Sequence, residues 1–160
     1  MARYRRRRSV TSVNRDKYSV ERTAFFTNVQ PTTTSSINVV PPTAVRGMRK
    51  VKHLNISVSG QTAADAPYVG LYWALVYVPE GYTPQAFGVP DAENPSVDLY
   101  GANQFVMDAG VIDFDAGPQR IRTPLSRNLN SGDSIVLLLR TTVGSAVGVH
   151  GVVKYAITLQ

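Results

Sequence analysis

The stretch VGVHGVVKYAITLQ, residues 147–160, decides the fold class because its apolar and polar side chains alternate. Its apolar side carries Val147, Val149, Val153, Tyr155, Ile157 and Leu159, and its polar side carries His150, Lys154, Thr158 and Gln160. A period of two residues is typical of an antiparallel strand with one face in the core and one in water. A second clear strand, residues 134–143, precedes it and is joined to it around Gly144 and Ser145.

Shorter strand-like runs recur towards the N-terminus and are separated by turn signals. They span Ser19–Val29, Arg49–Val58, Tyr68–Val78, Phe105–Met107, Val111–Phe114 and Arg120–Thr123. The fourth and fifth runs are either two short strands or one strand interrupted by Asp108, Ala109 and Gly110. We expect no long helix, since 12 Gly and 10 Pro interrupt these short runs. About eight strands predict an all-β domain of two packed sheets, with the jelly roll and the immunoglobulin-like sandwich as the main topologies.

The size and composition of the chain narrow the class of protein. With 160 residues, 43% of them apolar and 18% charged, we expect one domain with a hydrophobic core rather than a mostly disordered or coiled-coil protein. The longest apolar run, Tyr68–Val78, has 11 residues and is too short to cross a bilayer as a helix, so we expect no membrane insertion. The absence of cysteine excludes disulfides, thiolate nucleophiles and Cys-ligated zinc.

The whole net charge of +6 belongs to residues 1–22, which hold eight cations against two carboxylates, whereas residues 23–160 hold nine of each sign. We therefore predict an Arg-rich arm over residues 1–17, followed by one β-sandwich domain over residues 18–160. The predicted nucleic-acid-binding residues of the arm are Arg3, Tyr4, Arg5, Arg6, Arg7, Arg8, Arg15 and Lys17. Arginine forks pair with phosphate oxygens, and a tyrosine ring can stack on an unpaired base without reading its identity. The alternative for the arm is a solvated tail or a nuclear-localisation signal at Arg5–Arg8.

A second basic run, Arg46, Arg49, Lys50 and Lys52, stands at the entry of a predicted strand. Downstream, residues 53–119 hold eight carboxylates and no Lys or Arg. If this run and the arm lie near each other in space, the protein has one basic face suited to a nucleic-acid phosphate backbone. His53, next to Lys52, either adds to that face or occupies an ordinary edge position.

The run Ile135–Leu139 is apolar on both faces, although a two-layer sandwich covers only one face of each sheet. Val136 and Leu138 are the two side chains that need a cover outside the expected core. Either a loop of the same chain or a neighbouring subunit covers them, and the sequence leaves both alternatives open. Under the second alternative, Val136 and Leu138 form an assembly interface.

The sequence lacks a recognisable catalytic constellation. Its two histidines, His53 and His150, are about a hundred residues apart, and no G-x-S-x-G elbow, P-loop or dinucleotide fingerprint is present. We therefore expect a non-enzymatic protein without cofactor or metal centre. Asp113 and Asp115 point to one face of a strand, near Asp108. We expect a solvated strand end there, and the alternatives are a hard cation held between subunits or an acid/base pair.

Motifs along most of the chain resemble, in order, those of a known group of proteins. They are the Arg-rich start Arg3–Arg8, GMRKVK at 47–52, WALVYVPEG at 73–81, NQFV at 103–106, GPQRI at 117–121 and, most distinctive, LSRNLNSGDSI at 125–135. On these motifs the chain resembles the capsid proteins of small circular Rep-encoding single-stranded DNA viruses, a group with circovirus-like and nanovirus-like members.

This resemblance implies an eight-stranded single jelly roll that self-assembles into a T = 1 icosahedral shell of sixty copies and packages circular single-stranded DNA. It implies that Arg3 and Arg5–Arg8 face the lumen and also direct nuclear entry, so that the protein is found in the virion and in the host nucleus. A second hypothesis, from a different class, is a cellular nucleic-acid-binding β-domain with a basic tail. The body motifs favour the first, because a tailed binding domain has no need of them.

Overall fold

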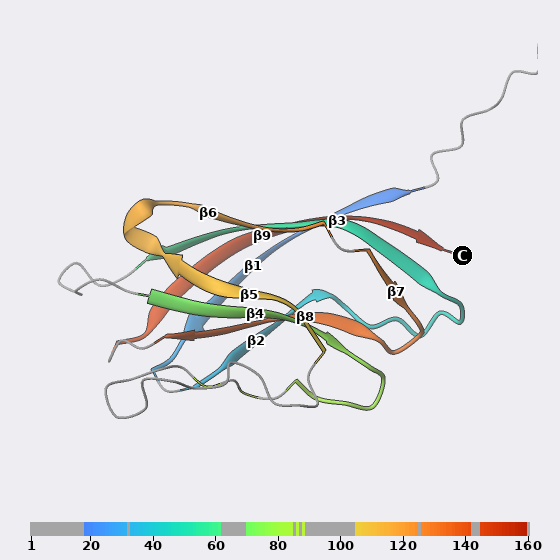
Figure 1. The fold of residues 1–160 in the computed structure, drawn as a ribbon, viewed down its shortest axis with the longest axis horizontal. Coiled ribbons are helices and arrows are strands. Elements are labelled where there is room, and N and C mark those ends of the chain that lie inside the picture. Colours follow the sequence, from blue (N-terminus) through green and yellow to red (C-terminus); the bar gives the residue numbers. More distant parts are fainter. Residues whose placement is uncertain are drawn as a thin grey trace, which may run out of the picture.

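A computed structural model of the chain describes residues 18–31, 33–61, 70–84, 86, 88, 105–124, 126–141 and 145–159, without the side chains of Asp115 and Leu159 (Figure 1). These ranges contain nine strands and one turn of 3-10 helix, Phe114–Ala116. The strands are β1 (Ser19–Val29), β2 (Ser35–Val40), β3 (Arg49–Gln61), β4 (Gly70–Val78), β5 (Phe105–Asp113), β6 (Gln119–Thr123), β7 (Arg127–Leu129), β8 (Ser134–Thr141) and β9 (Val147–Leu159). The prediction of an all-β protein is confirmed.

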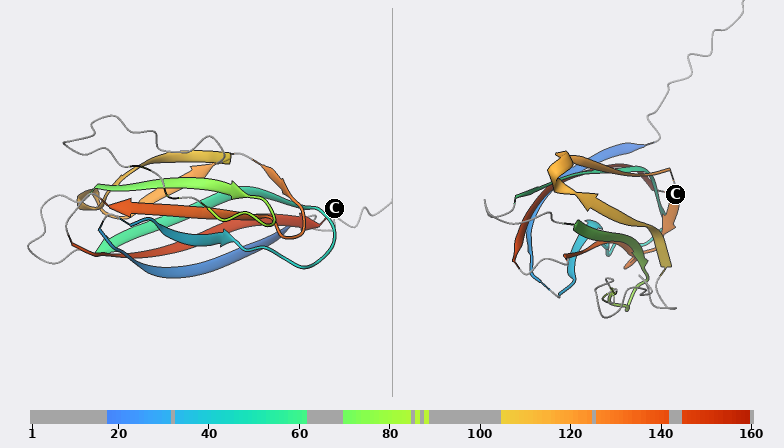
Figure 2. Two further views of the ribbon diagram at one scale, coloured as in Figure 1. Left: turned by 90° about the horizontal axis from the view of Figure 1, so that it is seen from below. Right: turned by 60° about the vertical axis from the view of Figure 1, so that its left-hand side comes forward.

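The strands form two antiparallel sheets that lie one over the other (Figures 1 and 2). Sheet A has the order β1-β9-β3-β6, and the short strand β7 also pairs with β3. Sheet B has the order β2-β8-β4-β5. The successive strands β8 and β9 therefore lie in different sheets, and the first strand of the chain pairs with the last. Two sheets packed in this way bury one face of each against the other.

The core lies between the inner faces of the two sheets. Ile56 of β3 and Val149 of β9 contribute to it from sheet A, and Leu75 of β4 and Leu137 of β8 from sheet B, all fully buried. The alternation expected for residues 147–159 is confirmed from Val147 to Tyr155, where valines at odd positions are buried while Lys154 is exposed, but Thr158, expected on the wet face, is only 7% exposed. This inward alternation leaves the polar side chains of sheet A on its outer face.

A second apolar cluster lies on the outer face of sheet B. It comprises Ala74, Val76, Val78, Val136 and Leu138, with Tyr72, Val106 and Ala109 packed against it. Val136 is only 2% exposed and Leu138 only 1% exposed in the single chain. Of the two covers expected for these side chains, their burial within one chain favours the intramolecular one, because a neighbouring subunit is not needed to keep them from water.

A bulge in β3 changes which residues face the core. The register between β3 and β9 shifts between Lys52 and Asn55, and His53 adopts a φ of 54°. Before the bulge the core-facing residue is Val51, at an odd position, whereas after it the core-facing residues are Leu54 and Ile56, at even positions. A β-bulge inserts one extra residue into a strand and so reverses its side-chain parity. The bulge thus places Lys50 and Lys52 on the outer face of sheet A.

Candidate nucleic-acid interface

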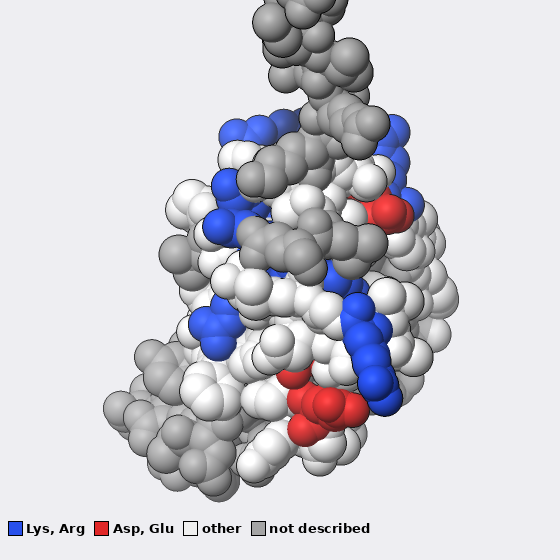
Figure 3. All heavy atoms as spheres, turned by 90° about the vertical axis from the view of Figure 1, so that its right-hand side faces the viewer, with Lys and Arg blue, Asp and Glu red and all other residues white. Residues whose placement is uncertain are grey.

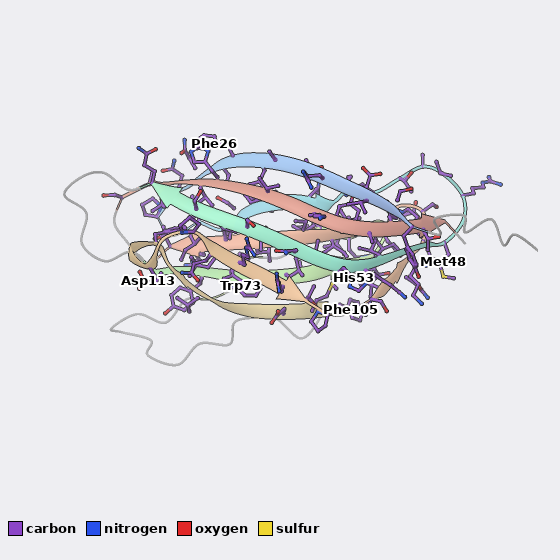
Figure 4. All side chains as sticks on the ribbon, turned by 90° about the horizontal axis from the view of Figure 1, so that it is seen from above. Phe26, Met48, His53, Trp73, Phe105 and Asp113 are labelled. Carbon is purple, nitrogen blue, oxygen red and sulfur yellow. The ribbon has the colours of Figure 1, made fainter. Side chains whose placement is uncertain are left out.

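Six cationic side chains share the outer face of sheet A, which Figure 4 views from above. They are Arg22 on β1, Lys50 and Lys52 on β3, Arg120 and Arg122 on β6, and Lys154 on β9. All six are exposed or half-buried. The carboxylates that the structure describes lie elsewhere. The one in sheet A, Glu21, is opposite the core-facing Tyr155 in the register of β1 and β9, so it lies on the other side of the sheet. Among the described residues, the Lys, Arg, Asp and Glu side chains on this face are therefore all cationic.

The strand registers align three of these cations in one row across sheet A. Arg22 is opposite Lys154, Lys154 is opposite Asn55, and Asn55 is opposite Arg122. With strands about 4.8 Å apart, the row is about 14 Å long. Like charges directly opposite each other, as in Arg22 and Lys154, destabilise an antiparallel pair. A polyanion laid along the row would relieve this repulsion.

The N-terminal arm joins the domain at the same face. Tyr18, the residue that follows the arm, has its ring centroid 5.1 Å from Nζ of Lys52, a cation–π contact. Figure 3 views the end of the molecule where β1 begins and β9 ends, and Lys and Arg are prominent on it. The predicted arm residues Arg3, Tyr4, Arg5, Arg6, Arg7, Arg8, Arg15 and Lys17 lie outside the described residues. The contact of Tyr18 nevertheless connects their point of attachment to the cationic face.

The prediction that Arg49 faces phosphate is wrong. Arg49 is only 6% exposed, and its guanidinium donates hydrogen bonds to the carbonyl oxygens of Pro41 at 3.1 Å and Asp133 at 2.9 Å. Its odd position before the bulge turns it to the inner face of β3, where the two carbonyls bind its Nη atoms and its buried Nε has no hydrogen-bond partner among the described residues. Of the other residues in that run, Lys50 and Lys52 are on the outer face, and Arg46 is exposed in the connection before β3.

Sequence reasoning missed four of the six cations. Arg22 counts in the charge balance of the N-terminus but not among the predicted site residues, and Arg120, Arg122 and Lys154 are not among them either. The spacing of Arg120 and Arg122, two apart in a short strand, indicates that they share one face. What the sequence does not contain is the register that places β6 beside β3 and so brings these arginines near Lys154.

The distinctive motif at 125–135 has a structural role at the end of the sandwich. Asp133 is only 4% exposed. Its carboxylate accepts hydrogen bonds from the Tyr77 hydroxyl at 2.8 Å, the backbone N–H of Asn130 at 2.8 Å and the backbone N–H of Glu80 at 3.1 Å. The Arg127 guanidinium lies 4.2 Å from the Tyr77 ring centroid. We call Asp133 and these partners, with Arg49 of β3 on the Asp133 carbonyl, the Asp133 cluster; it ties β3, β4, β7 and β8 together.

The Asp133 cluster predicts a loss of stability in acid. Burial alone would raise the pKa of Asp133, but hydrogen bonds from Asn130, Tyr77 and Glu80 and the charge of Arg49 together hold it below its ordinary value. A carboxyl whose pKa is lower folded than unfolded contributes stability above its unfolded pKa, near 3.9, and loses it as pH falls through the folded value. Urea unfolding midpoints should fall between pH 5 and pH 3 in the unsubstituted chain.

The matched control for this acid effect is Asp133→Asn, which has no carboxyl to titrate at that position. Its unfolding midpoint should be lower at neutral pH and should change less between pH 5 and pH 3. Equal acid sensitivity in the two proteins would assign the loss of stability to other carboxyls.

The remaining predicted positions do not form a site among the described residues. Those residues contain no group of three His, Cys, Asp or Glu side chains that could hold a metal ion. Asp108 accepts a hydrogen bond from the Ala109 amide at 3.0 Å, Asp113 is half-buried, and the side chain of Asp115 is not described. His53 is exposed at the bulge of β3, and His150 is exposed on β9.

Comparisons with known proteins add no further assignment. A scan against protein-family models and a search of curated proteins both find no match for this chain. In the part of the chain that the structure describes, no helix is long and apolar enough to span a membrane. The function therefore has to be inferred from the geometry of the described residues.

Proposed function

We propose that the chain is a viral capsid subunit that assembles into a closed shell, a T = 1 particle of sixty copies, and packages single-stranded DNA. The observation that carries this proposal is the outer face of sheet A, with six cations and no described carboxylate, joined to the arm next to Lys52. Phosphate contacts of this kind give affinity without sequence specificity, as packaging requires. The arm adds the remaining cations, and Arg5–Arg8 also serve in nuclear entry.

The strand order supports a single jelly roll. Apart from the three-residue strand β7, the chain has eight strands in two sheets of four. In sheet A the first strand neighbours the last, and in sheet B the second strand, β2, neighbours the next to last, β8. Such nested pairing of the two ends of the chain is what two interlocked Greek keys produce, and viral capsid domains are among the proteins built this way.

The separation of charge supports assembly around a polyanion. Residues 23–160 are neutral, so copies of the domain can approach one another without net repulsion. The excess of positive charge belongs to residues 1–22, and within them Tyr18 contacts Lys52 of the cationic face. Gathering many such arms in one lumen is unfavourable unless a polyanion neutralises them, which couples closure of the shell to packaging.

The direct test is purification of the full chain, followed by light scattering on a sizing column, electron microscopy and the ratio of absorbance at 260 and 280 nm. We expect megadalton particles that contain nuclease-resistant nucleic acid. A protein that stays a monomer or small oligomer at every salt concentration and pH, yet binds any polyanion, would instead identify a cellular nucleic-acid-binding domain. That result would contradict the capsid proposal.

A further inference from the structure

Two aromatic rings lie together on the cationic face. Phe26 of β1 is opposite His150 of β9, and their ring centroids are 4.7 Å apart with the planes tilted by 41°. Phe26 is 58% exposed, so more than half of a large apolar side chain is left in water. Figure 4 shows Phe26 at the end of sheet A opposite to Met48. An exposed aromatic ring beside cations is available for contact with a ligand.

The neighbours of the pair include small residues. Gly148, next but one to His150, has no side chain, and a Cβ there would lie 3.6 Å from the Phe26 ring, 3.7 Å from Oδ1 of Asn28 and 3.7 Å from the carbonyl oxygen of Gln61. The neighbouring pair on the same face is Ala24 opposite Val152, and Val152 is 43% exposed. A flat ring with small neighbours leaves room for another flat ring to lie against it.

We propose that Phe26 and His150 form a stacking site for an unpaired nucleobase, while the cations of the same face hold the adjoining phosphates. This inference rests on the proposed function and deepens it. Arg22 is four residues from Phe26 along β1, about 13 Å at the rise of a strand, which an extended strand of nucleic acid can bridge. Sequence-tolerant stacking combined with a cationic track is the usual means of binding single strands.

The proposed site discriminates by strandedness, not by sequence. Bases in a duplex are stacked on one another and do not present their faces, so a duplex can use only the cations. Every unpaired base has a face to stack, in DNA and in RNA alike. A second copy of the protein fits this surface less well, because it would have to desolvate Arg22 and Lys154, and no described carboxylate lies on the face to pair with them.

The experiment compares the full chain with Phe26→Ala, Phe26→Leu and Phe26→Trp. The probes are 20-mers of deoxythymidine and uridine, an abasic DNA strand of equal charge and a DNA duplex, whose Kd is measured at several salt concentrations. We expect Phe26→Ala and Phe26→Leu to bind both base-bearing single strands about 5- to 150-fold more weakly, the range for loss of one stacked base. Phe26→Trp should bind as the unsubstituted protein does.

The abasic strand and the duplex are the decisive controls, since neither offers a free base. Their affinities should change less than twofold in all three variants, and the slope of log Kd against log salt should be unchanged. Phe105→Ala on β5, which removes another aromatic ring that is 55% exposed, is the control on a different sheet and should change nothing. If Phe26→Ala lost more affinity for the deoxythymidine strand than for the uridine strand, DNA would be the preferred source of the base.

Two results would overturn the stacking site. If Phe26→Ala lost as much affinity for the abasic strand as for the base-bearing strands, the substitution would perturb the phosphate contacts. Full affinity of Phe26→Leu for the deoxythymidine strand would show that no ring is needed. In both cases salt-dependent binding by the unsubstituted chain would still support the proposed function. Failure of the unsubstituted chain to bind any of the four probes would overturn the proposed function itself, and the stacking site with it.

Discussion

Replacing Arg22, Arg120, Arg122 and Lys154 together by Gln should weaken single-strand binding about a hundredfold at about 0.15 M salt. The four side chains lie on the outer face of sheet A, and three of them form the row across its strands. Each lost phosphate contact to a single strand lowers the slope of log affinity against log salt by about 0.7. The slope, measured by titration at several salt concentrations, should therefore fall by about 3.

The matched control keeps the charges and changes the head groups. Arg22→Lys, Arg120→Lys and Arg122→Lys together, with Lys154 retained, should leave the salt slope nearly unchanged. Both variants should fold, because all four side chains are exposed, and the Gln variant also loses the unfavourable pairing of Arg22 with Lys154. If the Gln variant keeps the original slope, the outer face of sheet A does not contact phosphate.

Asp133→Ala should lower the free energy of unfolding by about 3–5 kcal/mol, the cost of breaking a buried, charged hydrogen-bond network. The substitution leaves the Tyr77 hydroxyl and the Asn130 and Glu80 amides without their acceptor. It also removes negative charge beside the buried Arg49. Burial and the bond to Asp133 both raise the pKa of Tyr77, so its hydroxyl stays protonated and needs an acceptor at neutral pH.

Asp108→Ala is the control for this prediction, since that carboxylate is half-buried and accepts a bond from the adjacent Ala109 amide. It should lower the free energy of unfolding by about 1 kcal/mol. Urea unfolding of both variants checks the comparison. Similar costs in the two proteins would show that the Asp133 cluster does not hold the sheets together.

The parts of the fold that follow from local alternation could be predicted from the sequence. The period of residues 147–159 identifies β9 and its wet face, and the apolar run Ile135–Leu139 indicates a strand that is covered on both sides. Both features depend on local side-chain chemistry, alternating in β9 and apolar at every residue in Ile135–Leu139, which requires no knowledge of neighbouring strands. What covers Val136 and Leu138 needs tertiary structure, because either cover is compatible with the same residues.

The composition of the cationic face could not be predicted, for two physical reasons. Strict alternation through β3 would put Lys50 and Lys52 on the side of Leu54, and only the bulge at His53 separates them. Burial of Arg49 depends on a carbonyl acceptor 84 residues away in sequence, at Asp133. Bulges and long-range acceptors arise from the pairing of distant strands, so a basic run alone cannot say which of its members meets a ligand.

We propose that the chain closes into a shell with its cationic face turned to nucleic acid. A cryo-electron microscopy reconstruction of the assembled full chain tests it most directly, because it shows both the closure and the orientation of each sheet. We predict a closed particle in which the outer face of sheet A and Tyr18 face internal nucleic-acid density, while sheet B lies further out. A particle with sheet A and Tyr18 on its exterior, or a protein that forms no closed particle, would overturn this proposal.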